Sequence, residues 1–241
     1  MDQESTTNMP VSMICFTELL GTTIPSEFLD KLDQLIDSQD EAVATYEENY
    51  SAASSLTSHR GLVLFQQIED PRIIMGSGQW PCSAVCADWF ASEQGVQFIS
   101  DMEPFHRPEA MDFAVVEGFI FPDATSDDAP SLIDAPQIEV TRWRVPSEQQ
   151  DRFNSAFDAL QRQRMQSGLQ CSIFSSWGLD DWPPRPDSET VKEFFMIACC
   201  SELEPTEAGA TGDIYGHLSK EEAVCKGLSI AVEKRHYAKA L

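Results

Sequence analysis

Apolar runs and helical stripes alternate along the first half of the chain in a regular order. Between residues 20 and 61, apolar residues recur at helical spacing from Phe28 to Ile36, and the segment 81–100 has a second helical pattern. An acidic, Ala- and Ser-rich insert, 38–59, is expected to add a helix with a flexible end. The strand-like runs cover residues 11–20, 61–65, 72–75 and 111–121. The pattern therefore predicts the order β-α-β-β-α-β.

The second half of the chain repeats this order with one helix reduced. A helical stripe of Phe153, Phe157 and Leu160 follows its first strand-like run. Residues 204–220 stand where the first half has its second helix, but they contain one proline and three glycines and are predicted to be largely loop. The strand-like runs of this half cover residues 138–145, 168–174, 193–200 and 226–233.

The first helix of each half begins with nearly the same sequence. Residues 25–32 read PSEFLDKL, and residues 146–153 read PSEQQDRF. Serine at an N-cap accepts a hydrogen bond from a backbone N–H, and acidic residues in the first turn favour the positive end of the helix dipole. Such an internal repeat predicts two copies of one β-α-β-β-α-β unit, which is the ferredoxin-like motif.

We therefore expect the fold class α+β, with two fused ferredoxin-like units forming a pseudo-dimeric α+β barrel. A four-stranded sheet with helices on one face leaves its other face bare, and two such units can bury those faces against each other. A segment rich in Pro, Asp and Ser is expected to link them. The expected boundaries are 1–10 for a disordered N-terminus, 11–121 for the first unit, 122–136 for the linker and 137–241 for the second unit.

The composition excludes several classes of partner. Forty acidic residues against 16 basic ones give a formal net charge of −24, which repels nucleic acid and anionic membrane surfaces. No apolar run reaches the roughly 18 residues that a spanning helix needs, and the N-terminus lacks the features of a secretory signal, so a cytoplasmic location is expected. Seven cysteines, an odd number, argue against a disulfide framework. Cys82 and Cys86 lack a second ligand pair nearby, so no metal is expected.

Four short stretches in the first half resemble a known family. They are residues 64–71 (LFQQIEDP), 78–83 (GQWPCS), 92–93 (SE) at the end of a helix, and 102–105 (MEPF). Together they resemble the antibiotic-biosynthesis-monooxygenase type of dimeric α+β barrel, and most of all its fused fungal members among tailoring proteins of secondary metabolism. Over the second half the resemblance rests on topology alone. Since the superfamily includes oxygenases, cyclases, decarboxylases, haem-degrading and stress proteins, it implies the fold more than the reaction.

Two histidines are candidates for acid–base chemistry. His106 lies in the loop before the closing strand of the first half, and His217, with Tyr215 beside it, occupies the related loop of the second half. In barrels of this family that loop borders the mouth of the cavity, where a histidine can exchange a proton near neutral pH. The alternative is a solvated loop histidine. His59 and His236 are expected to lie at the surface.

Aromatic and charged residues of the strands supply the other candidates. Trp80, Trp143 and Phe65 would wall a pocket for a flat substrate, or form the barrel core. Glu139 lies on the same face of its strand as Trp143, and burial would raise its pKa and make it a usable acid or base. Arg142 is on the opposite face. An inward Arg142 could hold a substrate carboxylate or enolate, but an orientation outward, to the acidic surface, is favoured.

The sequence contains no Gly-x-Gly-x-x-Gly, P-loop, His-Glu-x-x-His or Gly-x-Ser-x-Gly motif, so no cofactor is expected. The expected function is a cofactor-independent tailoring enzyme that guides cyclisation, dehydration or rearrangement of a small polyketide, aryl or terpenoid substrate. Two alternatives remain open: a cofactor-free monooxygenase of a phenolic substrate, and a non-catalytic barrel that binds a small molecule. A single working pocket is expected, and further homodimerisation stays open.

Overall fold

The computed structural model describes residues 9–50, 63–118, 120, 132–166, 171–179, 190–200 and 230–240. Its strands are β1 (Val11–Glu18), β2 (Val63–Gln67), β3 (Ile73–Trp80), β4 (Asp112–Glu117), β5 (Gln137–Pro146), β6 (Cys171–Trp177), β7 (Val191–Cys200) and β8 (Ala231–Lys239). Its α-helices are α1 (Ser26–Tyr50), α2 (Ser83–Ala91), α3 (Glu93–Met102) and α4 (Gln150–Gln166). Four short 3-10 turns are η1 (Glu103–Phe105), η2 (Pro108–Ala110), η3 (Leu132–Asp134) and η4 (Ser147–Gln149).

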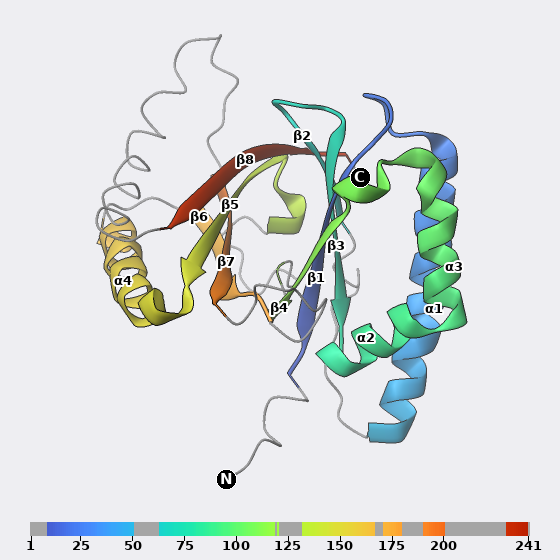
Figure 1. The fold of residues 1–241 in the computed structure, drawn as a ribbon, viewed down its shortest axis with the longest axis horizontal. Helices are drawn as coiled ribbons and strands as arrows, with labels where there is room; N and C mark the ends of the chain where they lie inside the picture. The colour runs from blue at the N-terminus through green and yellow to red at the C-terminus, as the bar shows by residue number, and fades with distance from the viewer. Residues whose placement is uncertain are drawn as a thin grey trace.

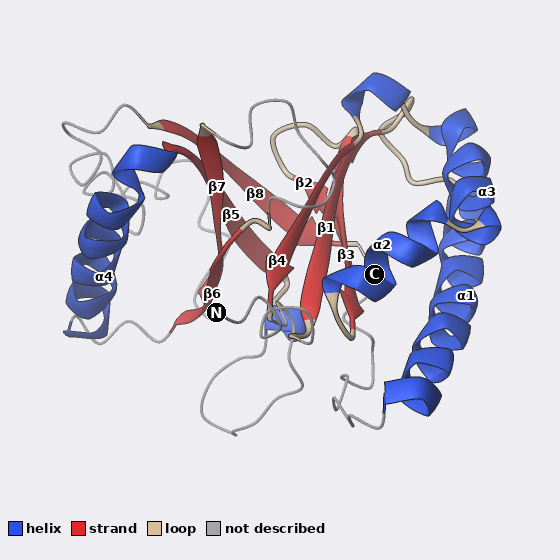
Figure 2. Cartoon of the chain, turned by 60° about the horizontal axis from the view of Figure 1, so that its bottom comes forward, coloured by secondary structure: helices blue, strands red, loops and turns tan. Residues whose placement is uncertain are grey.

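The described strands form one antiparallel sheet that curls into a nearly closed barrel (Figures 1 and 2). Its order is β4-β1-β3-β2-β8-β5-β7-β6, so each consecutive set of four strands has the same internal order. The edge strands β4 and β6 approach each other, because Val116 and Gly178 form a β-bridge and the Leu179 N–H donates to the Val115 carbonyl at 2.7 Å. In Figure 2 the helices α1, α2 and α3 lie on one side of the barrel and α4 on the other, all of them outside it.

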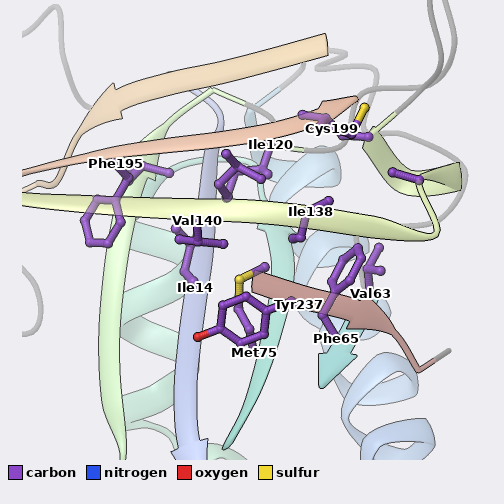
Figure 3. Close-up of a cluster of buried hydrophobic side chains, with 14 of the residues drawn as sticks. Ile14, Val63, Phe65, Met75, Ile120, Ile138, Val140, Phe195, Cys199 and Tyr237 are labelled. Carbon is purple, nitrogen blue, oxygen red and sulfur yellow. The ribbon is translucent and has the colours of Figure 1, made fainter. Parts of the chain in front are cut away.

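Alternate residues of each strand face the barrel interior or a helix, and both faces are buried. The interior holds a cluster of buried side chains that includes Ile14, Phe65, Val140 and Phe195 (Figure 3). The opposite face of the same strands packs on the helices: Val11 and Met13 of β1 belong to a different cluster, beneath α1 and α2. The sheet is therefore the middle of a layered protein, and its inner face is shared by all the strands.

Several expected boundaries change. Residues 38–50 of the expected insert do not form a separate helix, because α1 continues unbroken to Tyr50. Residues 51–59 lie outside the described ones. The helix expected at 81–100 is two helices, since Ser92 ends α2 and caps α3, accepting from the Gly95 N–H at 3.2 Å. The last strand covers Ala231–Lys239 instead of residues 226–233. The N-terminus before residue 9 and most of the linker also lie outside the described residues.

Residues beside and within the expected linker close one end of the barrel. Ile120, which follows β4, and Leu132 and Ala135, which precede β5, are buried in the interior cluster. Ser12 fixes the first of these, since its hydroxyl donates to the Gly118 carbonyl at 2.9 Å and accepts from the Ile120 N–H at 3.0 Å. Gly118 has a φ of 85°, which a side chain would strain, and this turn directs Ile120 into the barrel. Among the described residues no helix is both long and apolar enough to cross a membrane.

The Ser12 contacts give a testable prediction for stability. Ser12→Ala leaves the buried Ile120 N–H unpaired, which costs about 1–3 kcal/mol of the free energy of unfolding. Denaturant unfolding of the variant measures this loss. Ser175→Ala, at an exposed position of β6, is the matched control and is expected to change the free energy by less than about 0.5 kcal/mol. Equal effects at the two positions would contradict this role for Ser12.

Candidate functional site

Arg142 extends into the barrel from β5. Ile138 and Val140, at the alternate positions before it, belong to the interior cluster, so Arg142 shares their face. Its Nε and Nη2 donate to Glu193 Oε1 of β7 at 3.0 and 2.6 Å, and its Nη1 donates to Asp112 Oδ2 of β4. The expected outward orientation is therefore wrong. A buried guanidinium needs counter-charges, and the interior supplies two carboxylates.

We name Asp112, Arg142 and Glu193 the mouth cluster. Burial opposes the charge of Arg142, but hydrogen bonding to Asp112 and the charge of Glu193 outweigh it, and the pKa of Arg142 rises above its ordinary value. The side chains of Arg142 and Glu193 are 9% and 13% exposed, whereas that of Asp112 is 38% exposed. The Asp112 carboxylate is thus the member of the cluster that a molecule entering from solvent can reach.

The topology places the mouth cluster at the end of the barrel opposite the linker segments. Asp112 begins β4 and Ile120 follows the end of that strand, while Ala135 precedes β5 and Arg142 lies toward its far end. Arg144, farther along β5, is 56% exposed and reaches Glu193 at 3.2 Å. One end of the barrel is therefore filled by apolar side chains, and the other carries charged ones close to solvent.

Aromatic side chains line the interior beside this cluster. The Arg142 guanidinium lies over the Phe195 ring, 5.5 Å from its centroid. Phe16 of β1 is the register partner of Asp112, and its ring is 6.3 Å from that of Tyr237 of β8. Tyr237 is fully buried, which raises its pKa to about 12 although the charge of Arg235 opposes this. Anionic groups and flat apolar walls thus meet at one end of the barrel.

The structure separates the aromatic residues predicted to wall a pocket. Phe65 lies in the barrel interior, as Figure 3 shows. Trp80 instead packs against Trp89 of α2, with ring centroids 5.6 Å apart, and Trp143 packs against Phe153 of α4 at 5.8 Å. Because both tryptophans occupy helix-facing positions of their strands, they belong to the layers between sheet and helices and do not line the interior.

His106 is buried, 2% exposed, and is therefore not the solvated loop residue of the alternative interpretation. It forms a β-bridge with Leu19, which packs in the cluster beneath Phe28 of α1. Neither ring nitrogen of His106 has a hydrogen-bond partner. The structure thus places His106 beside the helix-facing layer of the first half. His217 and Tyr215 lie outside the described residues.

Glu139 joins a second charged group, on the outer face of the sheet. Its Oε2 is 3.0 Å from Lys234 Nζ and 3.7 Å from His236 Nε2, and His236 Nδ1 pairs with Glu69 from the turn after β2. Burial acts to raise the pKa of Glu139, but the nearby His236 and the charge of Lys234 outweigh it, so the pKa is lowered. The raised pKa expected for Glu139 is therefore wrong, and the group holds an ionised carboxylate.

Sequence reasoning missed Asp112, Glu193 and Tyr237. The available signal is an acid at or near the beginning of an otherwise apolar strand, in DFAVVE for Asp112 and VKEFFMIACC for Glu193. From the sequence alone, such an acid is interpreted as a solvent-exposed residue at a strand end, unless Arg142 is known to point into the barrel. Within the described part of the chain, no group of three or more His, Cys, Asp and Glu side chains could hold a metal ion.

Comparisons with known proteins give evidence on the fold alone. No protein-family model matches the sequence, and no curated protein matches it either. The chain is similar to the crystal structure of an anthrone oxidase-like protein, with a TM-score of 0.52 and 12% identity over 97% of this chain and 92% of the other. It also resembles proposed monooxygenases from Fusobacterium nucleatum (TM-score 0.48, 10% identity, 97% and 93% covered) and Lactobacillus acidophilus (0.45, 10%, 96% and 94%). The first likeness shows that the chain has an α+β barrel fold, and it carries no statement about the reaction.

The His236 group predicts how stability depends on pH. The nearby carboxylate of Glu139 and the contacts with Glu69 raise the pKa of His236 above its ordinary value despite partial burial. A raised folded-state pKa contributes stability that is complete below about pH 6.5 and is lost as the pH rises through the folded value. The free energy of unfolding should therefore fall by about 1 kcal/mol or less above pH 6.5, since the group is partly screened by solvent. His236→Gln should flatten this fall, and a variant with the unchanged pH profile would contradict the assignment.

Proposed function

We propose that the protein is a cofactor-independent enzyme that removes a proton from a small, mostly apolar and enolisable substrate at the mouth of the barrel. The observation that carries the proposal is the mouth cluster, in which Arg142 holds the carboxylates of Asp112 and Glu193 beside aromatic walls. Proton transfer by a positioned side chain is one of the main sources of rate acceleration that a site without cofactor can supply.

Asp112 is the proposed base and Arg142 the proposed stabiliser of charge. A carboxylate oxygen accepts a proton from an activated C–H or a phenolic O–H, and the negative charge passes to the substrate oxygen. A guanidinium already fixed by two carboxylates needs no reorganisation to stabilise that developing charge. Asp112 can act because it is the most exposed of the three side chains. The enolate so formed can cyclise, eliminate water or rearrange, as a tailoring reaction of secondary metabolism requires.

The repeated strand order supports the view that two ferredoxin-like units of a fused, pseudo-dimeric kind build this site. Both sets of four strands have the same internal order. The repeated sequences 25–32 and 146–153 form corresponding helix starts, at α1 in the first case and at η4 and α4 in the second. Asp112 comes from the first set, and Arg142 and Glu193 come from the second. Under this proposal the mouth cluster exists only where the two units meet, which fits one working site instead of two.

A second candidate is oxygenation of a phenolic or anthrone-type substrate. It is favoured by the likeness to the anthrone oxidase-like protein, which shares the fold. The proton-removal step is the same, and the substrate carbanion then reacts with O2 directly. For anthrone, one oxygen atom of O2 becomes the new carbonyl oxygen and the other leaves as water. Oxygen uptake with anthrone separates this candidate from the first, since cyclisation and dehydration consume no O2.

Proton removal itself is tested with anthrone under anaerobic conditions in D2O. Exchange of its C10 hydrogen, followed by NMR, reports the proposed step whether or not oxygenation follows. Asp112→Asn should slow enzyme-dependent exchange by roughly 100-fold or more, since a positioned base contributes factors of about 10²–10⁴. Asp112→Glu, which keeps a carboxylate, should retain part of the rate.

Glu117→Gln, at an exposed position near the other end of β4, is the matched control and should exchange at the wild-type rate. Each variant's denaturant unfolding shows whether it is folded, because Asp112→Asn also removes one partner of Arg142. Wild-type exchange rates in a folded Asp112→Asn variant would overturn the proposal. Binding of anthrone without any exchange by the wild type would instead support the non-catalytic alternative.

A further inference from the structure

Tyr237 carries a buried hydroxyl that the packing of the barrel does not use. The residue is 0% exposed and belongs to the interior cluster, where its ring contacts apolar side chains from both sets of strands. The Arg235 guanidinium lies near this hydroxyl from the same strand, but a guanidinium can only donate, and no acceptor takes the hydroxyl hydrogen. A buried hydroxyl without a partner costs free energy that a phenylalanine of the same shape would not. The tyrosine at this position therefore calls for an explanation other than packing.

Two neighbouring strands repeat the feature. Gln67 on β2 is the register partner of Tyr237, and its side-chain carbonyl oxygen is buried without a partner, as is the Ser77 hydroxyl on β3. The strands β3, β2 and β8 are adjacent in the sheet, and all three residues occupy interior-facing positions. Such groups are normally paired in proteins. Tyr237 and Gln67 lie side by side, whereas Ser77 is in register with Val63, farther along β2. The adjacent pair is consistent with polar contacts to a bound molecule.

The hydroxyl of Tyr237 points toward the mouth cluster. In Figure 3 it is directed away from Phe65 and Val63 and toward the side of the barrel where Phe195 lies. The Arg142 guanidinium lies over the Phe195 ring. The ring centroids of Phe16 and Tyr237 are 6.3 Å apart, and Phe16 is the register partner of Asp112. A flat molecule lying along Phe16 would therefore extend from Asp112 at the mouth to Tyr237 in the interior.

The protonation state of Tyr237 decides which group it can bind. Burial raises its pKa to about 12, against the opposing charge of Arg235, so the side chain remains a neutral O–H donor throughout the physiological range. Arg235 and Glu233 share this face of β8 but pair with each other. A neutral acceptor therefore suits Tyr237 best, because an ionised one would pay a large desolvation penalty in the buried interior. A ketone carbonyl is such an acceptor.

We propose that Tyr237 donates a hydrogen bond to a ketone oxygen of the substrate, in a subsite deeper in the barrel than the mouth cluster. The substrate class is then a planar aryl or polyketide ketone whose carbonyl lies at the inner end and whose acidic hydrogen lies near Asp112. The position of the acidic hydrogen rests on the proposed function, whereas the hydrogen bond from Tyr237 concerns binding alone.

The test measures binding of two probes that differ only in the carbonyl, 9-fluorenone and fluorene, by quenching of tryptophan fluorescence. The wild type should bind 9-fluorenone more tightly than fluorene. Tyr237→Phe should bind 9-fluorenone about tenfold more weakly, the effect of one hydrogen bond, and should bind fluorene as the wild type does. Since the variant loses only an unpaired hydroxyl, its free energy of unfolding should be equal to or higher than that of the wild type.

Thr17→Val is the matched control. It removes another buried hydroxyl without a partner, but from a helix-facing position of β1, and should leave the affinity for both probes unchanged. The proposal is overturned if the wild type binds the two probes equally or not at all, if Tyr237→Phe keeps full affinity for 9-fluorenone, or if that variant loses affinity for both probes alike. Proton exchange that does not depend on Asp112 would remove the proposed function and leave the binding result standing.

Discussion

The buried charge of Arg142 is the constraint on which the organisation of the barrel depends. Its guanidinium is 9% exposed and can be held there only by partners that offset the loss of water. Those partners, Asp112 and Glu193, come from strands β4 and β7, on opposite sides of the place where the edge strands β4 and β6 meet. The ion pairs therefore connect the two sets of strands across the interior and fix which end of the barrel is polar.

The rest of the molecule can be understood from that division. At the far end, Ile120, Leu132 and Ala135 complete an apolar filling that needs no charge. Beneath the helices, Trp80 and Trp143 each pack among aromatic rings. The charged groups of the mouth cluster lie at the opposite end, and Glu233, Arg235 and Tyr237 face the interior from β8. A substrate that is mostly apolar but bears a ketone and an acidic hydrogen fits this distribution.

The sequence predicts the strands and their order well because apolar runs and helix starts are local signals. It cannot decide which way each residue faces, since both faces of the sheet are buried and apolar residues occupy both. Trp143 and Arg142 illustrate this: they are neighbours on β5, and exchanging the two faces exchanges their predicted roles. The last strand is predicted too early in the sequence for a related reason. Glu233, Arg235 and Tyr237 occupy its interior face, so this segment lacks the apolar run by which a buried strand is recognised. Asp112 and Glu193 are recognisable as functional candidates only once the inward direction of Arg142 is known.

The central claim is that a ligand binds inside the barrel, between the mouth cluster and Tyr237, and not between the sheet and its helices. A crystal structure of the protein with 9-fluorenone tests this most directly. The account predicts the planar probe in the interior, with its oxygen within hydrogen-bonding distance of the Tyr237 hydroxyl and its other edge toward Asp112. A probe lodged in the layer beneath α1, beside His106, or beneath α2, beside Trp80, would contradict it.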